Sequence, residues 1–374
     1  MVRLTRVQQQ ARTRASVLEA ARAEFTEHGY APAKVDRIAE RAELTRGAVY
    51  SNFPSKRSLY LAVLVDLVES EGSGGAPAAP GSPGTAGEAL GALARMWLER
   101  IPLADDPTAG GRLRLRSLSG AADRDRDRAV LAQTAHLEAL LLAIGLEACA
   151  PHAERRVRLA EVALTLLGGC GALAESAPGF GDPFDRIRAC EHLADLDLAD
   201  TWAPAHLPYV PPAAAVREPW SPPTGPVDVI GGGPVDLGAD GVVAVLGAHR
   251  LAAAEEAVRA ARPGEQVTVA VVTGDPAETG ALVRLRVVDL VACLRRVFPA
   301  RTWDGLRLVI DGDGAVAAAL GLPGADDETE AAVRIGEGRI TARAQGRGAA
   351  HAAATAGADD TAGRTASSGR QDLR

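Results

Sequence analysis

Residues 17–64 read VLEAARAEFTEHGYAPAKVDRIAERAELTRGAVYSNFPSKRSLYLAVL, and this stretch decides the fold of the N-terminal part of the chain. Apolar residues recur along it at helical spacing, beginning with Leu18, Ala21 and Phe25 on one face. Gly29 is placed to end that first helix. We therefore expect a small bundle of short helices here.

The third helix of this bundle has the residues needed to enter a DNA groove. Thr45 is a good N-cap for a helix that continues to Phe53, and its exposed side is polar. Arg46 matches guanine or phosphate, and Asn52 matches the edge of adenine. Lys56 begins the next helix, where an ammonium group and backbone N–H groups can share a phosphate. The buried side of the bundle is expected to consist of Phe25, Ile38, Ala39, Val49 and Phe53.

The distribution of charge supports a nucleic-acid partner, although the whole chain carries a net charge of −7. Residues 1–60 hold eleven Lys and Arg against six Asp and Glu. The rest of the chain is correspondingly acidic. A basic segment on an acidic body is typical of a small DNA-binding domain joined to a larger partner.

The set of motifs in residues 17–64 resembles the TetR family of transcriptional regulators. The matching features are Ala20-Ala21, Phe25, Gly29-Tyr30, Ile38-Ala39, Ala42, Thr45–Phe53 and Ser55-Lys56. The resemblance implies a helix-turn-helix, a homodimer on double-stranded DNA with a palindromic operator, and a helical domain that binds a small-molecule effector. It also implies that Tyr50 contacts phosphate. The expected DNA-binding residues are Lys34, Thr45, Arg46, Tyr50, Ser51, Asn52 and Lys56.

Two departures from the family pattern concern the backbone and the second helix. The family often has Gly where this chain has Glu43, so Glu43 is expected in a left-handed conformation. Ala33 and Lys34 stand where a hydroxyl residue commonly precedes the second helix. We expect Lys34 to replace the lost phosphate contact.

Composition divides the chain into a multidomain protein: an all-α part followed by an α/β part. The expected segments are a DNA-binding domain at 12–70, a flexible linker at 71–87, a helical domain at 88–202, a Pro-rich linker at 203–226, an α/β domain at 227–345 and a disordered tail at 346–374. The linker at 203–226 contains eight prolines, which favours an extended conformation.

Residues 88–202 are expected to bind the effector and to form the dimer. Long helices at about 154–175 and 183–198 occupy the usual places of a four-helix dimer interface in the family. A monomer core is the alternative explanation of their apolar stripes. The residues expected to line a ligand pocket are Met96, Trp97, Leu137 and Leu141, and the alternative for them is an ordinary core.

The α/β domain resembles thioredoxin-like domains of the peroxiredoxin type. The resemblance lies in Phe298-Pro299, LRLVIDGDGAVAAALGL and AAVRIGEGRITARAQG. After the strand 242–246, however, the chain has Ala248, His249 and Arg250 where that family places its reactive cysteine. We therefore expect a thioredoxin-like fold without peroxidase or disulfide activity.

These observations favour a cytoplasmic, ligand-responsive repressor that is not an enzyme and needs no cofactor or metal. The four cysteines form no CxxC pair and match no zinc spacing. No transmembrane helix and no membrane partner are expected. The alternative is a redox enzyme with a DNA-binding appendage, and a third class makes the C-terminal domain a dimerisation or partner-binding module. A truncation at about residue 205, assayed for dimerisation and DNA binding, would separate the third class from the first.

Overall fold

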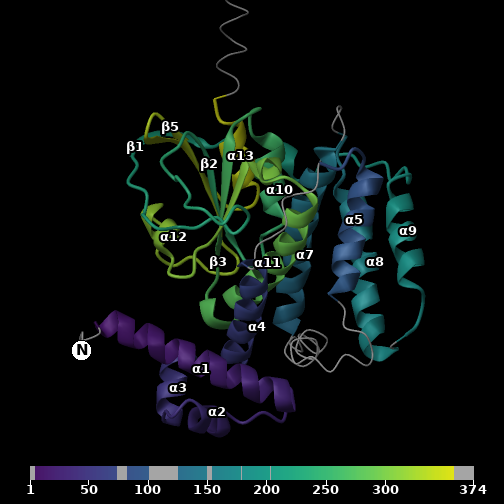
Figure 1. Ribbon diagram of the computed structural model, residues 1–374. Helices are drawn as coiled ribbons and strands as arrows, with labels where there is room; N and C mark the ends of the chain where they lie inside the picture. The colour runs from purple at the N-terminus through teal and green to yellow at the C-terminus, as the bar shows by residue number, and fades with distance from the viewer. Residues whose placement is uncertain are drawn as a thin grey trace, which may run out of the picture. The chain divides into compact units, whose positions relative to one another are not determined.

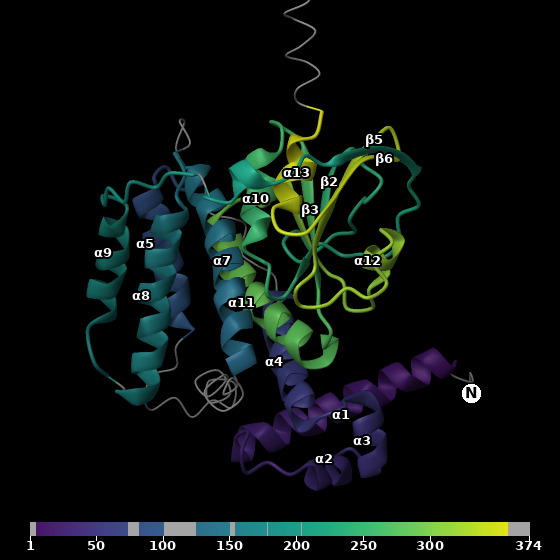
Figure 2. The ribbon, with the colours of Figure 1, turned by 180° about the vertical axis from the view of Figure 1, so that it is seen from behind.

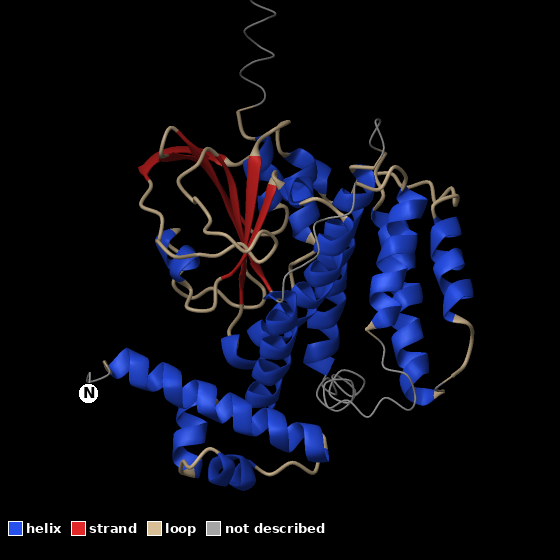
Figure 3. Cartoon of the chain, in the orientation of Figure 1, coloured by secondary structure: helices blue, strands red, loops and turns tan. Residues whose placement is uncertain are grey.

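The computed structural model describes residues 5–73, 82–100, 125–149, 154–177, 179–202 and 204–357. The chain divides into two compact units. The helical unit comprises Met1–Asp200 and Asp275–Thr302, and the α/β unit comprises Thr201–Gly274 and Trp303–Arg374. Strands occur in the α/β unit and long helices dominate the helical unit (Figure 3).

The helical unit begins with the four helices that the sequence predicts. They are α1 (Arg6–His28), α2 (Val35–Arg41), α3 (Arg46–Asn52) and α4 (Lys56–Ser73). Thr5 and Gln8 form a capping box at the start of α1, and Gly29 ends it at φ 76°. Glu43 lies in the turn between α2 and α3 at φ 55°, in the left-handed conformation expected for it. Phe25, Ile38, Ala39, Val49 and Phe53 are all buried, as predicted.

The rest of the helical unit is built from α5 (Ala86–Glu99), α7 (Asp125–Glu147), α8 (Val157–Ser176), α9 (Pro183–Leu193), η2 (Pro276–Gly280) and α11 (Ala281–Val297). Helix α5 packs on α9, and α7 packs on α8. Helix α11 packs against α4, α7 and α5. Figures 1 and 2, seen from opposite sides, both place α11 beside α4 and α7.

The position of α11 differs from the sequence-based expectation, which assigned residues 227–345 to one α/β domain. Residues 275–302 lie between two strands of the sheet in sequence but cluster with the helical unit. The reason is the apolar face of α11, which is buried from Leu282 to Val297. Phe298 adds to this contact, since a Cβ at Gly145 of α7 would lie 2.8 Å from its ring.

The α/β unit contains one six-stranded mixed sheet. Its strands are β1 (Ala214–Pro219), β2 (Gly241–Gly247), β3 (Gln266–Val272), β4 (Leu306–Ile310), β5 (Glu330–Gly336) and β6 (Arg339–Gln345), and their order is β1-β6-β5-β2-β3-β4. Strands β2, β3 and β4 are parallel, with Val245 opposite Ala270, whereas β5 is antiparallel to β2 and β6 is antiparallel to β5. The short elements are η1 (Leu207–Tyr209), α10 (Ala253–Ala260), η3 (Ala300–Trp303), α12 (Ala315–Ala319) and α13 (Ala349–Thr355).

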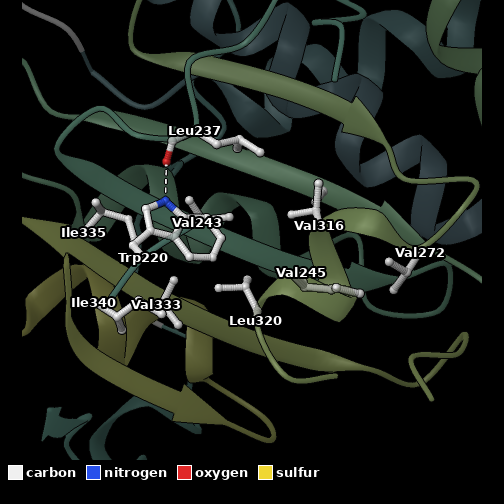
Figure 4. Close-up of a cluster of buried hydrophobic side chains, with 12 residues drawn as sticks. Trp220, Leu237, Val243, Val245, Val272, Val316, Leu320, Val333, Ile335 and Ile340 are labelled. Atoms are coloured by element: carbon white, nitrogen blue, oxygen red, sulfur yellow. Dashed lines mark hydrogen bonds between the residues drawn. The ribbon is translucent and has the colours of Figure 1, made fainter. Parts of the chain in front are cut away.

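One core of this unit forms around Trp220 on one face of the sheet. Its indole N–H donates a hydrogen bond to the Leu237 carbonyl at 2.7 Å, so the buried ring has a partner for its polar atom (Figure 4). Val243 and Val245 of β2 and Leu320 after α12 pack into the same cluster. The buried strands read as continuous apolar runs because both faces are covered.

Three expected segment boundaries are corrected by the structure. The Pro-rich linker 203–226 contains β1, which forms an edge strand on β6, a position that tolerates proline. The expected tail at 346–374 begins with α13, whose alanines are buried; residues 358–374 lie outside the described residues. The linker at 71–87 overlaps the end of α4 and the start of α5, because Thr85 caps α5; residues 74–81 lie outside the described residues.

Two helices of the described chain, Asp127–Glu147 and Val157–Ala174, are long and apolar enough to cross a membrane by length and composition. In the first, 61% of the residues are buried inside the protein, as in a core helix. In the second, only 33% are buried. Helix α8 therefore keeps much of its apolar surface exposed.

Candidate nucleic-acid interface

Helix α3 presents the residues that the sequence predicts for DNA contact. Thr45 caps it by accepting a hydrogen bond from the Ala48 N–H at 3.2 Å. Thr45, Arg46 and Ser51 are exposed, and Tyr50 is half-buried. The opposite side of α3 is fixed by Val49, which is buried. The helix is thus anchored on one side and polar on the other.

Arg46 is held in a position from which it is easily released. Its guanidinium lies 3.2 Å from Asp36 and 5.5 Å from the centre of the Tyr50 ring. A hydrogen bond with Tyr50, followed by the charge of Asp36, raises the pKa of Arg46. The Arg46 and Asp36 side chains are about 60% exposed (61% and 62%). An ion pair this exposed contributes little to stability because solvent screens it, so a guanine or phosphate can compete for Arg46.

Ser51 and Asn52 are already engaged within α3. The Ser51 hydroxyl and the Asn52 amide both donate to the Ala48 carbonyl, at 2.8 and 2.9 Å. The backbone carbonyl of Asn52 accepts a hydrogen bond from Arg14 of α1. The Arg14 guanidinium also lies over the Phe53 ring, 4.2 Å from its centre. Asn52 therefore ties α3 to α1, and a contact with adenine requires its amide to leave Ala48.

Lys56 is positioned at the N-terminus of α4 by contacts with the loop after α1. Its ammonium donates to the Ala31 carbonyl at 3.0 Å and lies 4.9 Å from the centre of the Tyr30 ring. Partial burial lowers the pKa of Lys56. The charge and the first N–H groups of α4 thus lie at the same end of one helix, which is the arrangement that binds phosphate.

Sequence reasoning missed Glu24, which supports the start of α2. Lys34 has no side-chain cap; instead, its backbone N–H donates to the Glu24 carboxylate at 3.2 Å, while its side chain stays exposed. Glu24 is fully buried and lies 3.6 Å from Arg41. The sequence contains a sign of this role. Glu24 falls on the same helical face as Ala21 and Phe25, where an apolar residue is expected, and a buried carboxylate needs hydrogen-bond or ion-pair partners.

Glu24, Glu27 and His28 form the one group among the described residues whose ligand atoms are close enough to hold a metal ion. Arg41 already pairs with both carboxylates, and it forms two hydrogen bonds with Glu27. These contacts lower the pKa of Glu27, first through the hydrogen bond with Arg41. The group is therefore better described as an ion-pair network that joins α1 to α2.

A sequence profile of the bacterial regulatory proteins of the tetR family matches residues 17–63. Residues 17–63 are therefore similar to the N-terminal segment of TetR regulators. Within the same region, 52 residues are 42% identical to the HTH-type transcriptional repressor SCO4008 of Streptomyces coelicolor, which is 14% of this chain and 27% of that protein. The chain thus matches about a quarter of the length of this curated relative.

Solved structures of TetR regulators resemble about half of the chain. A TetR transcriptional regulator from Rhodococcus sp. RHA1 is 23% identical, with 50% of this chain and 96% of that chain covered and a TM-score of 0.29. RolR in complex with resorcinol is 21% identical, with 52% and 93% covered and a TM-score of 0.31.

The four residues expected to line a ligand pocket lie on two helices of the helical unit. Met96 and Trp97 are half-buried on α5, and Leu137 and Leu141 are fully buried on α7. Helices α5 and α7 are in contact. The structure thus places the two pairs on neighbouring helices, with Leu137 and Leu141 buried.

Proposed function

We propose that this protein is a transcriptional repressor of the TetR type that acts in the cytoplasm and binds a palindromic operator as a homodimer. The observation that carries the proposal is helix α3, anchored by Val49 and capped by Thr45, with Arg46 and Tyr50 on its polar side. Lys56 at the start of α4 adds a phosphate site beside it. Both lie in the TetR-type domain, whose local charge is basic.

The binding claim is tested by selecting DNA from a random pool with the full chain and sequencing it. One palindromic sequence should emerge, and affinity should fall steeply with salt because neutralised phosphates release counterions. Tyr50→Phe and Lys56→Ala should weaken all sequences alike. Arg46→Ala should cost about 1–3 kcal/mol and relax the preference at one position. Arg339→Ala, the loss of an exposed arginine in the α/β unit, is the matched control. Salt-independent binding, or a pool without a preferred sequence, contradicts the proposal.

The homodimer is supported by the exposed face of α8 and α9. Phe184 is 74% exposed and Leu173 is 40% exposed. Gly168 and Gly169 are exposed on α8, and a Cβ added to either would meet nothing within 4 Å. Small residues between apolar ones allow two helices to approach closely. A second copy of the chain, related by a two-fold axis, would bury this same patch on both partners.

We also propose that a small apolar effector binds near Met96 and Trp97 and releases DNA. The support is that both side chains are half-buried on α5, a helix that contacts α7, where Leu137 and Leu141 are buried. A switch requires the effector to prefer the state that does not bind DNA. Compounds that raise the melting temperature should do so less when operator is present. Equal stabilisation in both cases contradicts coupling.

For the α/β unit we propose a thioredoxin-like domain without redox chemistry. The parallel β2–α10–β3 segment and the β5–β6 hairpin followed by α13 support it. His249 follows β2 and lies 2.8 Å from Glu328, an ion pair rather than a thiolate site. Cys293 is buried in the helical unit, where Arg100 donates to its sulfur at 2.7 Å and burial raises the pKa of the thiol. Peroxide consumption lost in Cys293→Ser would contradict this proposal and favour the redox enzyme.

A further inference from the structure

A buried network of charges connects the start of α4 to the segment that precedes α11. Arg57 donates a hydrogen bond to Glu278 at 2.7 Å, and its other terminal nitrogen lies 2.9 Å from Asp127 of α7. The Ser55 hydroxyl donates to the same Glu278 carboxylate at 2.6 Å. The side chains of Arg57, Asp127 and Glu278 are 8%, 4% and 15% exposed. One carboxylate from η2 therefore holds the residues on both sides of Lys56.

This network fixes the end of α4 that carries the proposed phosphate contact. Ser55 and Ser58 cap each other there, with each backbone N–H donating to the other's hydroxyl oxygen at 3.0 and 2.9 Å. Glu278 adds a bond to each side of Lys56, through Ser55 and Arg57. A buried ion pair is weak evidence for stability, since its desolvation offsets much of its attraction. Its clearer effect is to restrict the position of this helix end.

Glu278 is itself fixed by its place in the chain. Its backbone N–H donates to the Asp275 carboxylate at 3.1 Å, and Asp275 caps η2. Only residues 273–275 separate the end of β3 from Pro276. The end of β3 and the η2 helix that carries Glu278 are thus joined by a very short piece of backbone.

We propose that Glu278 is a positioning residue for DNA binding. It holds Ser55 and Arg57 so that Lys56 and the N–H groups at the start of α4 meet a phosphate. The inference rests on the proposed function, and it adds a residue that lies more than 200 positions from the helix-turn-helix.

The test compares Glu278→Ala and Glu278→Gln with a control at an ion pair between α4 and α11, the helix that follows η2. Arg284 of α11 pairs with Glu69 of α4 at 2.7 Å, but both side chains are more than 40% exposed (46% and 41%). Arg284→Gln should therefore leave operator affinity within about twofold, as for an exposed pair. Glu278→Ala should weaken operator binding about tenfold, and Glu278→Gln less, because the amide still accepts from Ser55.

The salt dependence separates positioning from general destabilisation. Loss of the phosphate contact at the start of α4 should lower the slope of log affinity against log salt by about one. A merely structural role lowers the melting temperature and leaves the slope unchanged. Glu278→Ala with wild-type affinity and slope overturns the inference alone, whereas a wild-type chain without sequence-specific binding overturns it together with the proposed function.

Hydrogen exchange on the wild-type chain provides the check if the variants fail to fold. Operator should slow amide exchange at residues 55–60 and also at 276–280, because the network links them. Slowing at 55–60 with no change at 276–280 would overturn the inference.

Discussion

Helices α8 and α11 are both long and apolar, yet they have opposite surroundings. In α11, nine of 17 residues are buried, although the helix comes from between two strands of the other unit's sheet. In α8, which lies in the helical part of the sequence, 33% of the apolar window is buried. The comparison shows that the structural unit to which an apolar helix belongs is not determined by the elements next to it in the sequence. The face of α11 is covered by this chain itself, and we propose that the exposed face of α8 is covered by a second copy.

The largest expected effect comes from removing α11. A chain ending at residue 202 keeps the sequence-defined helical domain but loses the helix that covers α4, α7 and α5. Each buried Leu or Val contributes about 1.5–3 kcal/mol, so the loss of α11 removes apolar burial comparable in size to the roughly 5–15 kcal/mol that stabilise a whole domain. Circular dichroism should therefore show no cooperative unfolding.

The matched control for this truncation is a chain in which residues 275–302 follow residue 200 through a flexible linker. It should recover cooperative melting, because it restores the missing face. If the chain ending at 202 melts like the helical part of the full protein, the assignment of α11 to the helical unit is wrong.

A smaller effect is expected at the face of α8 and α9. Glu in place of Leu173 or Phe184 puts a charge into the proposed dimer interface twice, once from each copy. A central apolar residue contributes about 2 kcal/mol, so the dimer should weaken by about 4 kcal/mol, close to a thousandfold. Sedimentation analysis should then show monomers. Tyr209→Glu, an equally drastic change at a residue 86% exposed in the α/β unit, should leave the dimer intact. Dimers that persist in Phe184→Glu and Leu173→Glu contradict the interface.

The local parts of the fold follow from the sequence, whereas the distant contacts do not. The periodicity around Phe25 and the cap at Thr45 depend on residues within a turn or two, so α1 and α3 are predictable. The partners Arg57 and Glu278 are 221 positions apart, and no local pattern joins them. Helix α13 was missed for another reason: a segment that is nearly all alanine has no polar face to reveal its periodicity.

The sequence indicates which residues are candidates for DNA contact, but it does not indicate which groups these side chains bond to within the protein. Helical position indicated Arg46, Asn52 and Lys56. Their bonds to Asp36, Ala48 and Ala31 depend on rotamers and on the packing of neighbouring helices. Such bonds decide how readily each side chain can turn to DNA, and only the three-dimensional structure reveals them.

Gly47 gives the most direct test of the claim that α3 enters a DNA groove. It is exposed in α3, and the nearest atom to an added Cβ is the Thr45 hydroxyl at 3.9 Å. Gly47→Ala should therefore fit the free protein and stabilise it by about 0.5 kcal/mol, because alanine favours the helix. The decisive measurement is the operator affinity of this variant beside its melting temperature. We expect an equal or higher melting temperature with affinity reduced about tenfold or more, since the new methyl group meets the DNA. Unchanged affinity would contradict it.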